Sequence, residues 1–273
     1  MKYTHAVVVR IPDAVQFSDN EKTTVDTCLI KKQLEDFAES LREAGTDIIE
    51  LAPEESCLKQ SLFVGDSAII INGTALITRP KNPGSRAAEV SRILAELTWE
   101  VIESPATFNG KPVVLEGSDV LFTGKEIFVG IRSNSTNMEG AFVVGKTFPD
   151  FSVVPITLPG NLPLKHYVAL IAPDVLAIGS SKDASIVIHR IERQATFRYK
   201  TLTMERDGAV NFVNVNDHII YRQDMPDAKF QQLKDPVKLW SVTASELVAV
   251  ADPISRFCLL VRKLRSCKSI WES

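Results

Sequence analysis

The chain has 273 residues, of which 45% are hydrophobic and 24% are charged, a balance typical of a globular protein with a core and not of a disordered chain. Its formal net charge of −3 provides no overall field that favours nucleic acid or anionic lipid as a partner. The apolar runs, such as residues 67–71, are far shorter than the roughly 20 residues that cross a bilayer, so we expect no membrane span.

The first residues lead directly into a strand-like run, 6–11, without an apolar leader or a cleavage site, which favours a cytoplasmic protein. The cysteines are widely spaced and form no CxxC pair. They therefore predict neither a zinc site nor a disulfide framework, and we expect four free thiols, no metal and no cofactor. The four are Cys28, Cys57, Cys258 and Cys267.

A pattern of strand, turn, strand, helix and strand recurs along the chain. After the strand at 6–11, a helix at 24–44 and a strand at 47–51, four complete copies follow. The Asn72-Gly73 turn between apolar runs is the strongest hairpin signal among them. The predicted copies are 62–71, 75–78, helix 85–97 and 99–103; 113–122, 127–131, helix 137–147 and 152–157; 167–171, 176–179, helix 183–194 and 200–204; and 210–215, 218–222, helix 227–233 and 237–243.

A fifth copy is split between the two ends of the chain. The strand-like run 257–262 supplies its first strand, and 6–11, 24–44 and 47–51 complete it. Repeats of roughly 40 to 50 residues cannot bury their faces alone and must stack, and a split copy implies closure into a ring. The sequence therefore predicts one α/β domain over residues 1–273, a five-unit propeller. The charged residues of the 24–44 helix are expected on its solvated outer face.

Several short stretches together resemble the dimethylarginine dimethylaminohydrolases. They follow the family in collinear order from about residue 3 to about residue 263. They are Thr4-His5-Ala6-Val7-Val8, Phe63-Val64-Gly65-Asp66, Thr74-Ala75-Leu76-Ile77-Thr78-Arg79-Pro80, Leu115-Glu116-Gly117-Ser118-Asp119-Val120-Leu121-Phe122-Thr123-Gly124 and Ser245-Glu246-Leu247.

This resemblance implies the pentein fold, a five-unit α/β propeller. It also implies hydrolysis of methylated arginine to citrulline, within arginine metabolism and nitric-oxide regulation. By the same resemblance, the polar segment 17–24 corresponds to a loop that acts as a lid over the pocket.

Hydrolysis of a guanidine in this way requires a thiolate nucleophile and an acid-base group that serves the leaving amine. The family's histidine aligns with Pro163, which cannot carry a proton; His166 follows three residues later. Counting without a gap from Ser-Glu-Leu places Arg256 at the nucleophile, and one inserted residue places Phe257 there. Neither is a nucleophile. Cys258 is interpreted as a small core residue.

The resemblance also identifies residues that would hold the substrate. The acid that orients the histidine aligns with Glu116, and Asp66 keeps a carboxylate that faces the cation. Two further acids are replaced, by Gln60 and Gly65. Arg86 matches the arginine that receives the amino acid's carboxylate. A second such arginine is replaced by Ser135, with Arg132 or Lys125 as compensating cations.

These substitutions predict a catalytically inactive or impaired member whose remodelled pocket binds a small amino-acid-like ligand. In that hypothesis, the Arg256 guanidinium lies among Glu116 and Asp66 and replaces the substrate's head group. One alternative is an active hydrolase that uses Cys258 as nucleophile with His166 and Glu116. A second alternative is a structural interaction module with a filled pocket. The chain could be a monomer or a homodimer, and no motif identifies a protein partner.

Overall fold

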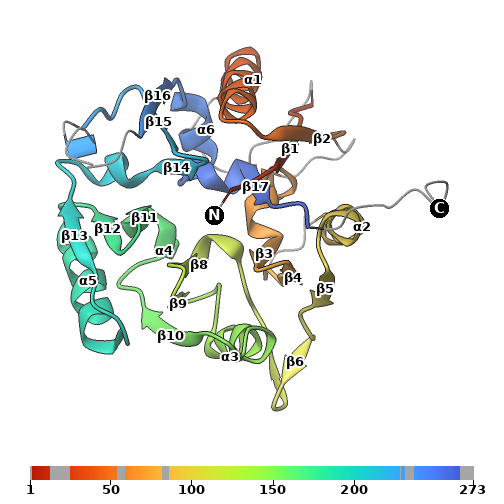
Figure 1. Ribbon diagram of the computed structural model, residues 1–273, viewed down its shortest axis with the longest axis vertical. Helices are drawn as coiled ribbons and strands as arrows, with labels where there is room; N and C mark the ends of the chain where they lie inside the picture. Colours follow the sequence, from red (N-terminus) through yellow and green to blue (C-terminus); the bar gives the residue numbers. More distant parts are fainter. Residues whose placement is uncertain are drawn as a thin grey trace, which may run out of the picture.

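In the computed structural model, the parts of the chain that can be described are residues 2–12, 25–53, 59–81, 86–227, 229–230 and 237–264. These residues form five three-stranded sheets and one two-stranded hairpin. The five sheets lie around a common centre (Figure 1). The five-unit ring predicted from the repeat pattern is therefore confirmed.

Each sheet has the same internal pairing. The first two strands pair antiparallel, and the second strand pairs parallel with the third. A parallel pair needs a crossover connection, which explains why a helix follows the second strand in the units built on β1, β4, β9 and β12. The strand orders are β17-β1-β2, β3-β4-β5, β8-β9-β10, β11-β12-β13 and β14-β15-β16.

The strand bounds agree with most of the expected ranges. They are β1 His5–Val9, β2 Asp47–Leu51, β3 Ala68–Ile71, β4 Thr74–Ile77, β5 Glu100–Glu103, β6 Thr107–Phe108, β7 Lys111–Pro112, β8 Val120–Phe122, β9 Glu126–Ile131, β10 Ser152–Thr157, β11 Val168–Ala172, β12 Val175–Ile178, β13 Lys200–Thr203, β14 Phe212–Val215, β15 His218–Arg222, β16 Lys238–Val242 and β17 Cys258–Val261.

The ring closes through the two ends of the sequence. β17 pairs antiparallel with β1, with His5 opposite Val261 and Val8 opposite Cys258. This pairing completes the split unit, as the sequence predicts. The segment between α6 and β17 contributes Ala251, Asp252 and Arg256 to the lining of a central cavity.

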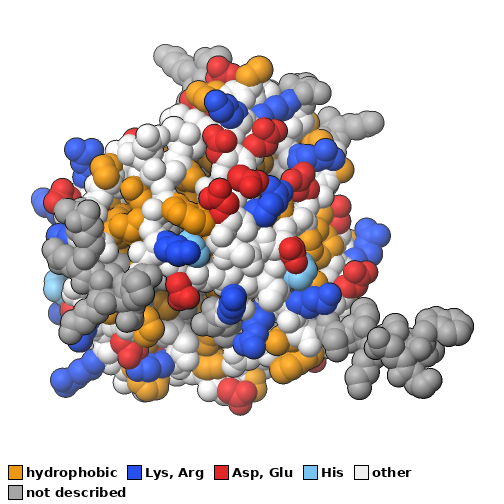
Figure 2. Space-filling view, turned by 45° about the horizontal axis from the view of Figure 1, so that its top comes forward, with side chains coloured by type: hydrophobic (Ala, Val, Ile, Leu, Met, Phe, Trp, Pro, Cys, Tyr) orange, Lys and Arg blue, Asp and Glu red, His pale blue; other side chains and the backbone are white. Residues whose placement is uncertain are grey.

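The helices follow from capping and apolar spacing. They are α1 Thr27–Glu43, α2 Ala87–Leu97, α3 Met138–Thr147, α4 Leu164–Tyr167, α5 Lys182–Gln194 and α6 Ser245–Val250. In α1, the Asp26 side chain accepts from two backbone N–H groups of the first turn, and the apolar residues Ile30, Leu34, Phe37 and Leu41 form a buried stripe. The charged residues of α1 are exposed or half-buried, and Figure 2 shows side chains of both signs interspersed on that face.

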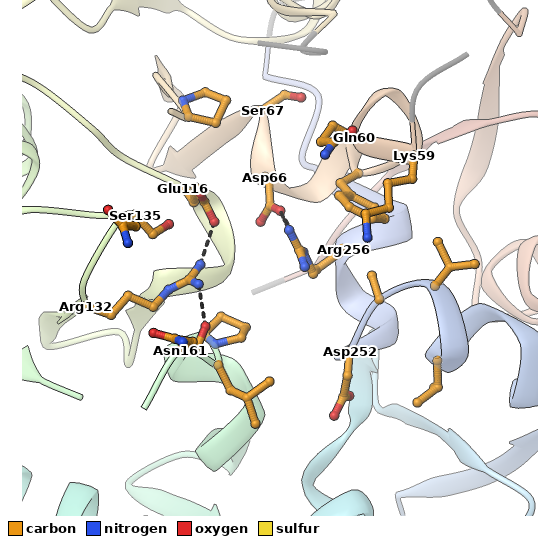
Figure 3. Close-up of a pocket in the computed structure, with 18 of the residues that line it drawn as sticks. Lys59, Gln60, Asp66, Ser67, Glu116, Arg132, Ser135, Asn161, Asp252 and Arg256 are labelled. Atoms are coloured by element: carbon orange, nitrogen blue, oxygen red, sulfur yellow. Dashed lines mark hydrogen bonds and ion pairs between the residues drawn. The ribbon is translucent and has the colours of Figure 1, made fainter. Parts of the chain in front are cut away.

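Two predicted strands are shorter in the structure. The run 62–71 is extended only from Ala68, because the 3-10 turns η1 Lys59–Leu62 and η2 Val64–Asp66 come first. The run 113–122 is a strand only from Val120, after the 3-10 turn η3 Gly117–Asp119. At both places the bent backbone packs closely: a Cβ on Gly117 would lie 2.3 Å from the carbonyl oxygen of Gly65. These bends bring Asp66 and Glu116 to the centre of the ring (Figure 3).

The hairpin β6–β7 was not expected from the sequence. It turns at Asn109-Gly110, where both residues have positive φ, as they do at Asn72-Gly73. The predicted lid 17–24, most of the helix 227–233, Cys57 and Cys267 lie outside the described residues. Within the described parts of the chain, no helix is both long and apolar enough to cross a membrane.

Candidate functional site

A cavity of about 570 Å³ lies at the centre of the ring (Figure 3). Its walls come from residues far apart in the sequence, because the ring brings loops and turns of different units together at its centre. Acidic, basic, amide and hydroxyl side chains are mixed over its surface. The described residues that line it are Lys59, Gln60, Phe63, Asp66, Ser67, Pro80, Glu116, Arg132, Ser133, Asn134, Ser135, Asn161, Leu162, Pro163, Val248, Ala249, Val250, Ala251, Asp252 and Arg256.

Arg256 forms an ion pair with Asp66 on one wall of the cavity. Its Nε and Nη2 lie 2.7 Å and 2.6 Å from Asp66 Oδ2, and its guanidinium carbon lies 4.2 Å from the centre of the Phe63 ring. The other carboxylate oxygen of Asp66 accepts from the backbone N–H of Ser118 at 2.8 Å. Both side chains are mostly buried, so this contact is a charge-assisted pair that fixes the guanidinium.

The local backbone explains how Arg256 reaches the cavity. It lies in the 3-10 turn η6 Ile254–Phe257, immediately before β17. The Asn211 side chain accepts from the backbone N–H of Ile254 at 2.6 Å and holds this turn. The turn sends Arg256 into the cavity and Phe257 into the core, where its ring packs edge-on against Phe63 at 5.6 Å.

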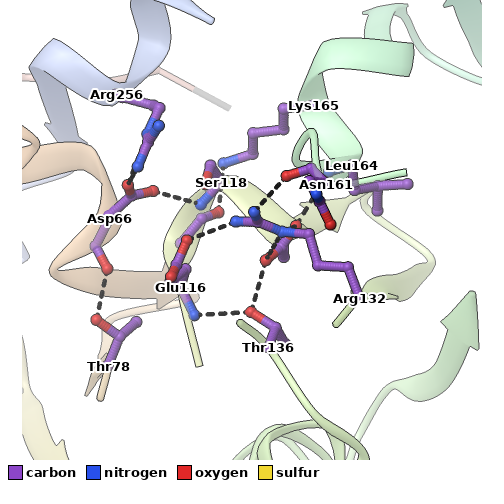
Figure 4. Close-up of polar contacts among 12 residues, drawn as sticks. Asp66, Thr78, Glu116, Ser118, Arg132, Thr136, Asn161, Leu164, Lys165 and Arg256 are labelled. Carbon is purple, nitrogen blue, oxygen red and sulfur yellow. Dashed lines mark hydrogen bonds and ion pairs between the residues drawn. The ribbon is translucent and has the colours of Figure 1, made fainter. Parts of the chain in front are cut away.

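Arg132 holds the opposite wall (Figure 4). Its Nη2 donates to Glu116 Oε2 at 2.6 Å, its Nη1 to the backbone oxygen of Asn161 at 2.6 Å, and its Nε to Asp119 Oδ2 at 3.0 Å. Asp119 also accepts from the Thr136 hydroxyl at 2.6 Å. Every nitrogen of the Arg132 guanidinium therefore has a protein acceptor, and Glu116 is bound to a cation.

Burial shifts the pKa values of two groups beneath the cavity. Asp119 is fully buried, and burial raises its pKa to about 6, although the nearby Arg132 and the Thr136 hydroxyl oppose the shift. Burial lowers the pKa of Lys165, whose Nζ donates to the backbone oxygen of Gly117 at 3.0 Å. Both groups connect η3 to α4, and so they fix the floor of the cavity.

His166 is paired with Asp252 and not with Glu116. The distance from His166 Nδ1 to Asp252 Oδ2 is 2.5 Å, and the other carboxylate oxygen accepts from the Asn211 amide. His166 itself is not among the residues that line the cavity. Pro163 is, and it provides the N-cap position of α4 with no side-chain hydrogen bond.

Cys258 lies on β17, outside the cavity lining. It is 4% exposed, and its Sγ lies 3.9 Å from the backbone oxygen of Ser255. Burial raises the pKa of its thiol to about 12, against a smaller lowering effect from Lys165. Because the η6 turn directs Arg256 into the cavity, this point of the described wall carries an arginine and no thiol.

The remaining predicted residues divide into two groups. Gln60 and Ser135 line the cavity, and no polar atom of the described residues bonds Ser135 Oγ. Arg86 lies at the start of α2, where its Nη1 donates to Glu89 at 3.0 Å, and it is not among the lining residues. Lys125 forms a partly exposed pair with Asp174. The ligand-binding roles assigned to these residues stay predictions.

Sequence reasoning missed three residues of this site. Asp119 stands in the same short motif as Glu116, and its buried position could have been suspected from that spacing. Lys59 and Asp252 line the cavity but carry no recognisable motif. Among the described residues, no group of three or more His, Cys, Asp or Glu side chains is arranged to hold a metal ion.

No family model matches the chain. Two mammalian proteins, both named "Putative hydrolase DDAH2", are similar over most of its length. The human protein is 31% identical over 275 residues, and the bovine protein is 30% identical over the same span; each alignment covers 94% of both chains. The N(G),N(G)-dimethylarginine dimethylaminohydrolase of Streptomyces coelicolor is 32% identical over 163 residues, which is 58% of this chain and 60% of that enzyme.

Solved structures show the same fold at lower identity. The dimethylarginine dimethylaminohydrolase of Pseudomonas aeruginosa, determined in complex with citrulline, aligns with a TM-score of 0.75 at 19% identity, covering 95% of this chain and all of that one. The N-terminal domain of the cyanobacterial arginine dihydrolase ArgZ aligns with a TM-score of 0.75 at 15% identity, covering 96% and 98%. These likenesses confirm the predicted α/β propeller of the pentein type.

Proposed function

Because the chain belongs to the dimethylarginine dimethylaminohydrolase family, we propose that it is a member without hydrolase activity whose cavity binds a small amino-acid-like ligand. The observation that carries this proposal is the Arg256–Asp66 ion pair, at 2.6 Å, inside the cavity. A built-in guanidinium satisfies a carboxylate that the family resemblance assigns to the substrate's cation.

The position of the thiol supports the same conclusion. A cysteine attacks as its thiolate, and thiolates that react readily have lowered pKa values and are accessible. Cys258 has the opposite properties, since it is buried and its pKa is raised to about 12. His166, the alternative base, is bound to Asp252 instead of Glu116. The two residues of the alternative mechanism therefore lack the contacts that this mechanism needs.

Electrostatics also oppose the binding of a methylated arginine. Glu116 and Asp66 are each bound by an arginine of the chain itself. The Arg256–Asp66 pair is neutral as a whole, so Arg256 offsets the attraction that Asp66 alone would exert on a second guanidinium.

The cavity itself favours a ligand-binding role over a purely structural one. A filled pocket would leave little space between Arg132 and Arg256, whereas about 570 Å³ remains. That volume lies within the range of about 300 to 1,000 Å³ that small-molecule sites occupy. The wall also has polar side chains that could bind a ligand, including those of Gln60 and Arg256.

A citrulline assay tests the proposal. The purified chain is incubated with asymmetric dimethylarginine, with the Streptomyces enzyme as positive control and a heat-killed sample as blank. We expect no citrulline above the blank, because the loss of a general acid-base group alone removes a factor of about 100 to 10,000 and the nucleophile is also absent.

Two cysteine variants assign any activity that is found. Citrulline formation that disappears in Cys258→Ser but persists in Cys28→Ser would establish the active-hydrolase alternative and overturn the proposal. Cys28 is the matched control because it is an exposed free cysteine on α1, far from β17 in the sequence.

A further inference from the structure

The carboxylates that line the cavity are already bound by donors of the chain. Asp66 accepts from Arg256 and from the Ser118 backbone, and Glu116 accepts from Arg132. Asp252 accepts from His166 and Asn211. The described lining therefore contains three acids and three cations, with each acid in contact with a cation or a histidine. Each carboxylate of this lining therefore already accepts a hydrogen bond from a side chain of the chain itself.

The donors of Arg256 are not all used. A guanidinium carries five N–H groups, and Asp66 takes one from Nε and one from Nη2. The two N–H groups of Nη1 and the second one of Nη2 have no acceptor among the described residues. One N–H of Nη1 and the second one of Nη2 point side by side off the end of the guanidinium, the other N–H of Nη1 points to the side opposite Asp66, and Phe63 covers one face of the group at 4.2 Å. A carboxylate fits such an edge, since arginine binds carboxylates through two parallel hydrogen bonds.

Arg132 differs from Arg256 in this respect. All its nitrogens donate to Glu116, Asp119 or Asn161, so it holds the wall and has no complete free edge. Ser135 also belongs to the lining, but its hydroxyl oxygen is buried, and this oxygen has no hydrogen-bond partner among the described residues. Of the two arginines of the wall, Arg256 is therefore the one with unused N–H donors that could bind a ligand.

We infer that this cavity selects small carboxylate-bearing anions, with the ligand's carboxylate on the free Nη1/Nη2 edge of Arg256. This inference concerns the same cavity as the proposed function and rests on it. It reverses the charge preference of the subsite around Asp66. The family resemblance implies that this subsite binds the guanidinium of a substrate. In this chain the Arg256 guanidinium occupies it, and we expect an anion to bind to Arg256.

Calorimetric titration with three amino acids tests the inference. L-glutamate, L-glutamine and L-arginine share one end and differ at the other in being anionic, neutral and cationic. We expect L-glutamate to bind about tenfold more tightly than L-glutamine, because a charge-assisted hydrogen bond stabilises a complex more than a neutral one. L-arginine should bind more weakly than both.

Two variants locate the preference. In Arg256→Gln, the ratio of the L-glutamine to the L-glutamate dissociation constant should fall from about ten to about one. Arg222→Gln is the matched control: Arg222 is a mostly buried arginine paired with Asp224 at 2.5 Å, and it does not line the cavity. It should keep the wild-type ratio. Thermal unfolding of each variant shows whether it is folded.

The wild-type titration decides the matter even if Arg256→Gln does not fold. Tighter binding of L-arginine than of L-glutamate, or no measurable preference for L-glutamate over L-glutamine, overturns the inference. So does a preference that survives in a folded Arg256→Gln protein. The citrulline assay on the same preparations is independent: citrulline formation overturns the proposed function, whereas no citrulline and no anion preference overturns this inference alone.

Discussion

Replacing Arg132 with methionine should destabilise the protein by an amount that depends on pH. Arg132 lies between two acids, and Asp119, the fully buried one, has a pKa raised to about 6 from an ordinary value of 3.8. A group whose pKa is raised in the folded state stabilises the fold while it is protonated, and this contribution is lost as the pH rises through the folded pKa. In the wild type, the free energy of unfolding therefore falls as the pH rises from about 4 to about 6. The difference between the two pKa values corresponds to roughly 3 kcal/mol of stability.

In the variant, the pH range over which the free energy of unfolding falls should extend to higher pH. Arg132 lowers the pKa of Asp119, so its removal raises this pKa further and extends the loss of stability above pH 6. At pH 8 the variant leaves a buried charge without its partner, which costs about 3 to 5 kcal/mol. At pH 5 Asp119 is mostly protonated in both proteins, so the variant leaves no buried charge there and loses only the hydrogen bonds to Glu116, Asn161 and Asp119, about 1 to 3 kcal/mol.

Urea unfolding at pH 5 and pH 8 measures both differences in the free energy of unfolding. Arg42→Met is the control, because Arg42 pairs with Glu39 on the surface, where both side chains are about half exposed. An exposed pair contributes about 0 to 1 kcal/mol, and the control should show no difference between the two pH values. An equal loss at both pH values for Arg132→Met, or a larger loss at pH 5, would refute the reasoning.

Two further predictions concern the packing of residues 255–258 against Gly65. In the native protein, iodoacetamide should modify Cys28, which is exposed, and leave Cys258, which is buried with a pKa raised to about 12; peptide mass mapping that finds equal labelling would contradict this burial. Gly65→Ala should destabilise the fold by about 1 to 3 kcal/mol or more, because the added Cβ would lie 2.3 Å from the Ser255 backbone oxygen. Gly145→Ala, in α3 with no neighbour nearer than 3.8 Å, should be neutral or slightly stabilising, and thermal unfolding of the two variants would show no difference if close packing at Gly65 were unimportant.

Local signals were sufficient to predict the ring. Apolar strand-like runs and helix spacing recur along the chain, the Asn72-Gly73 turn marks one hairpin, and each of these signals depends only on residues close in the sequence. The bends before β3 and β8 were not predictable in this way. The runs 62–71 and 113–122 contain enough apolar residues to read as strands, and only packing between their backbones interrupts them.

The contacts of the site were less predictable than its residues. The family motifs located Glu116, Asp66 and Arg256, but their partners depend on the fold. Arg256 and Asp66 are 190 residues apart, and His166 and Asp252 are 86 apart. Such pairs are decided by which side chains the closed ring brings to its axis. For this reason the sequence could suggest Glu116 as a neighbour of Arg256, whereas in the structure Glu116 is bound by Arg132.

Close packing couples the substitutions at this site to one another. A mostly buried guanidinium needs a carboxylate to compensate for lost hydration, and Asp66 supplies it at 2.6 Å. The turn that carries Arg256 in turn requires glycine at position 65, because a Cβ there would lie 2.3 Å from the Ser255 oxygen and 3.1 Å from the Arg256 Cα. An acidic side chain at position 65, as the family resemblance implies, is therefore incompatible with the present path of residues 255–258. Replacing Arg256 with cysteine alone would leave Asp66 without its cation. It would also not restore the acid that the family resemblance implies at position 65. The cavity's preference for anions therefore depends on the packed segment as a whole and not on one residue.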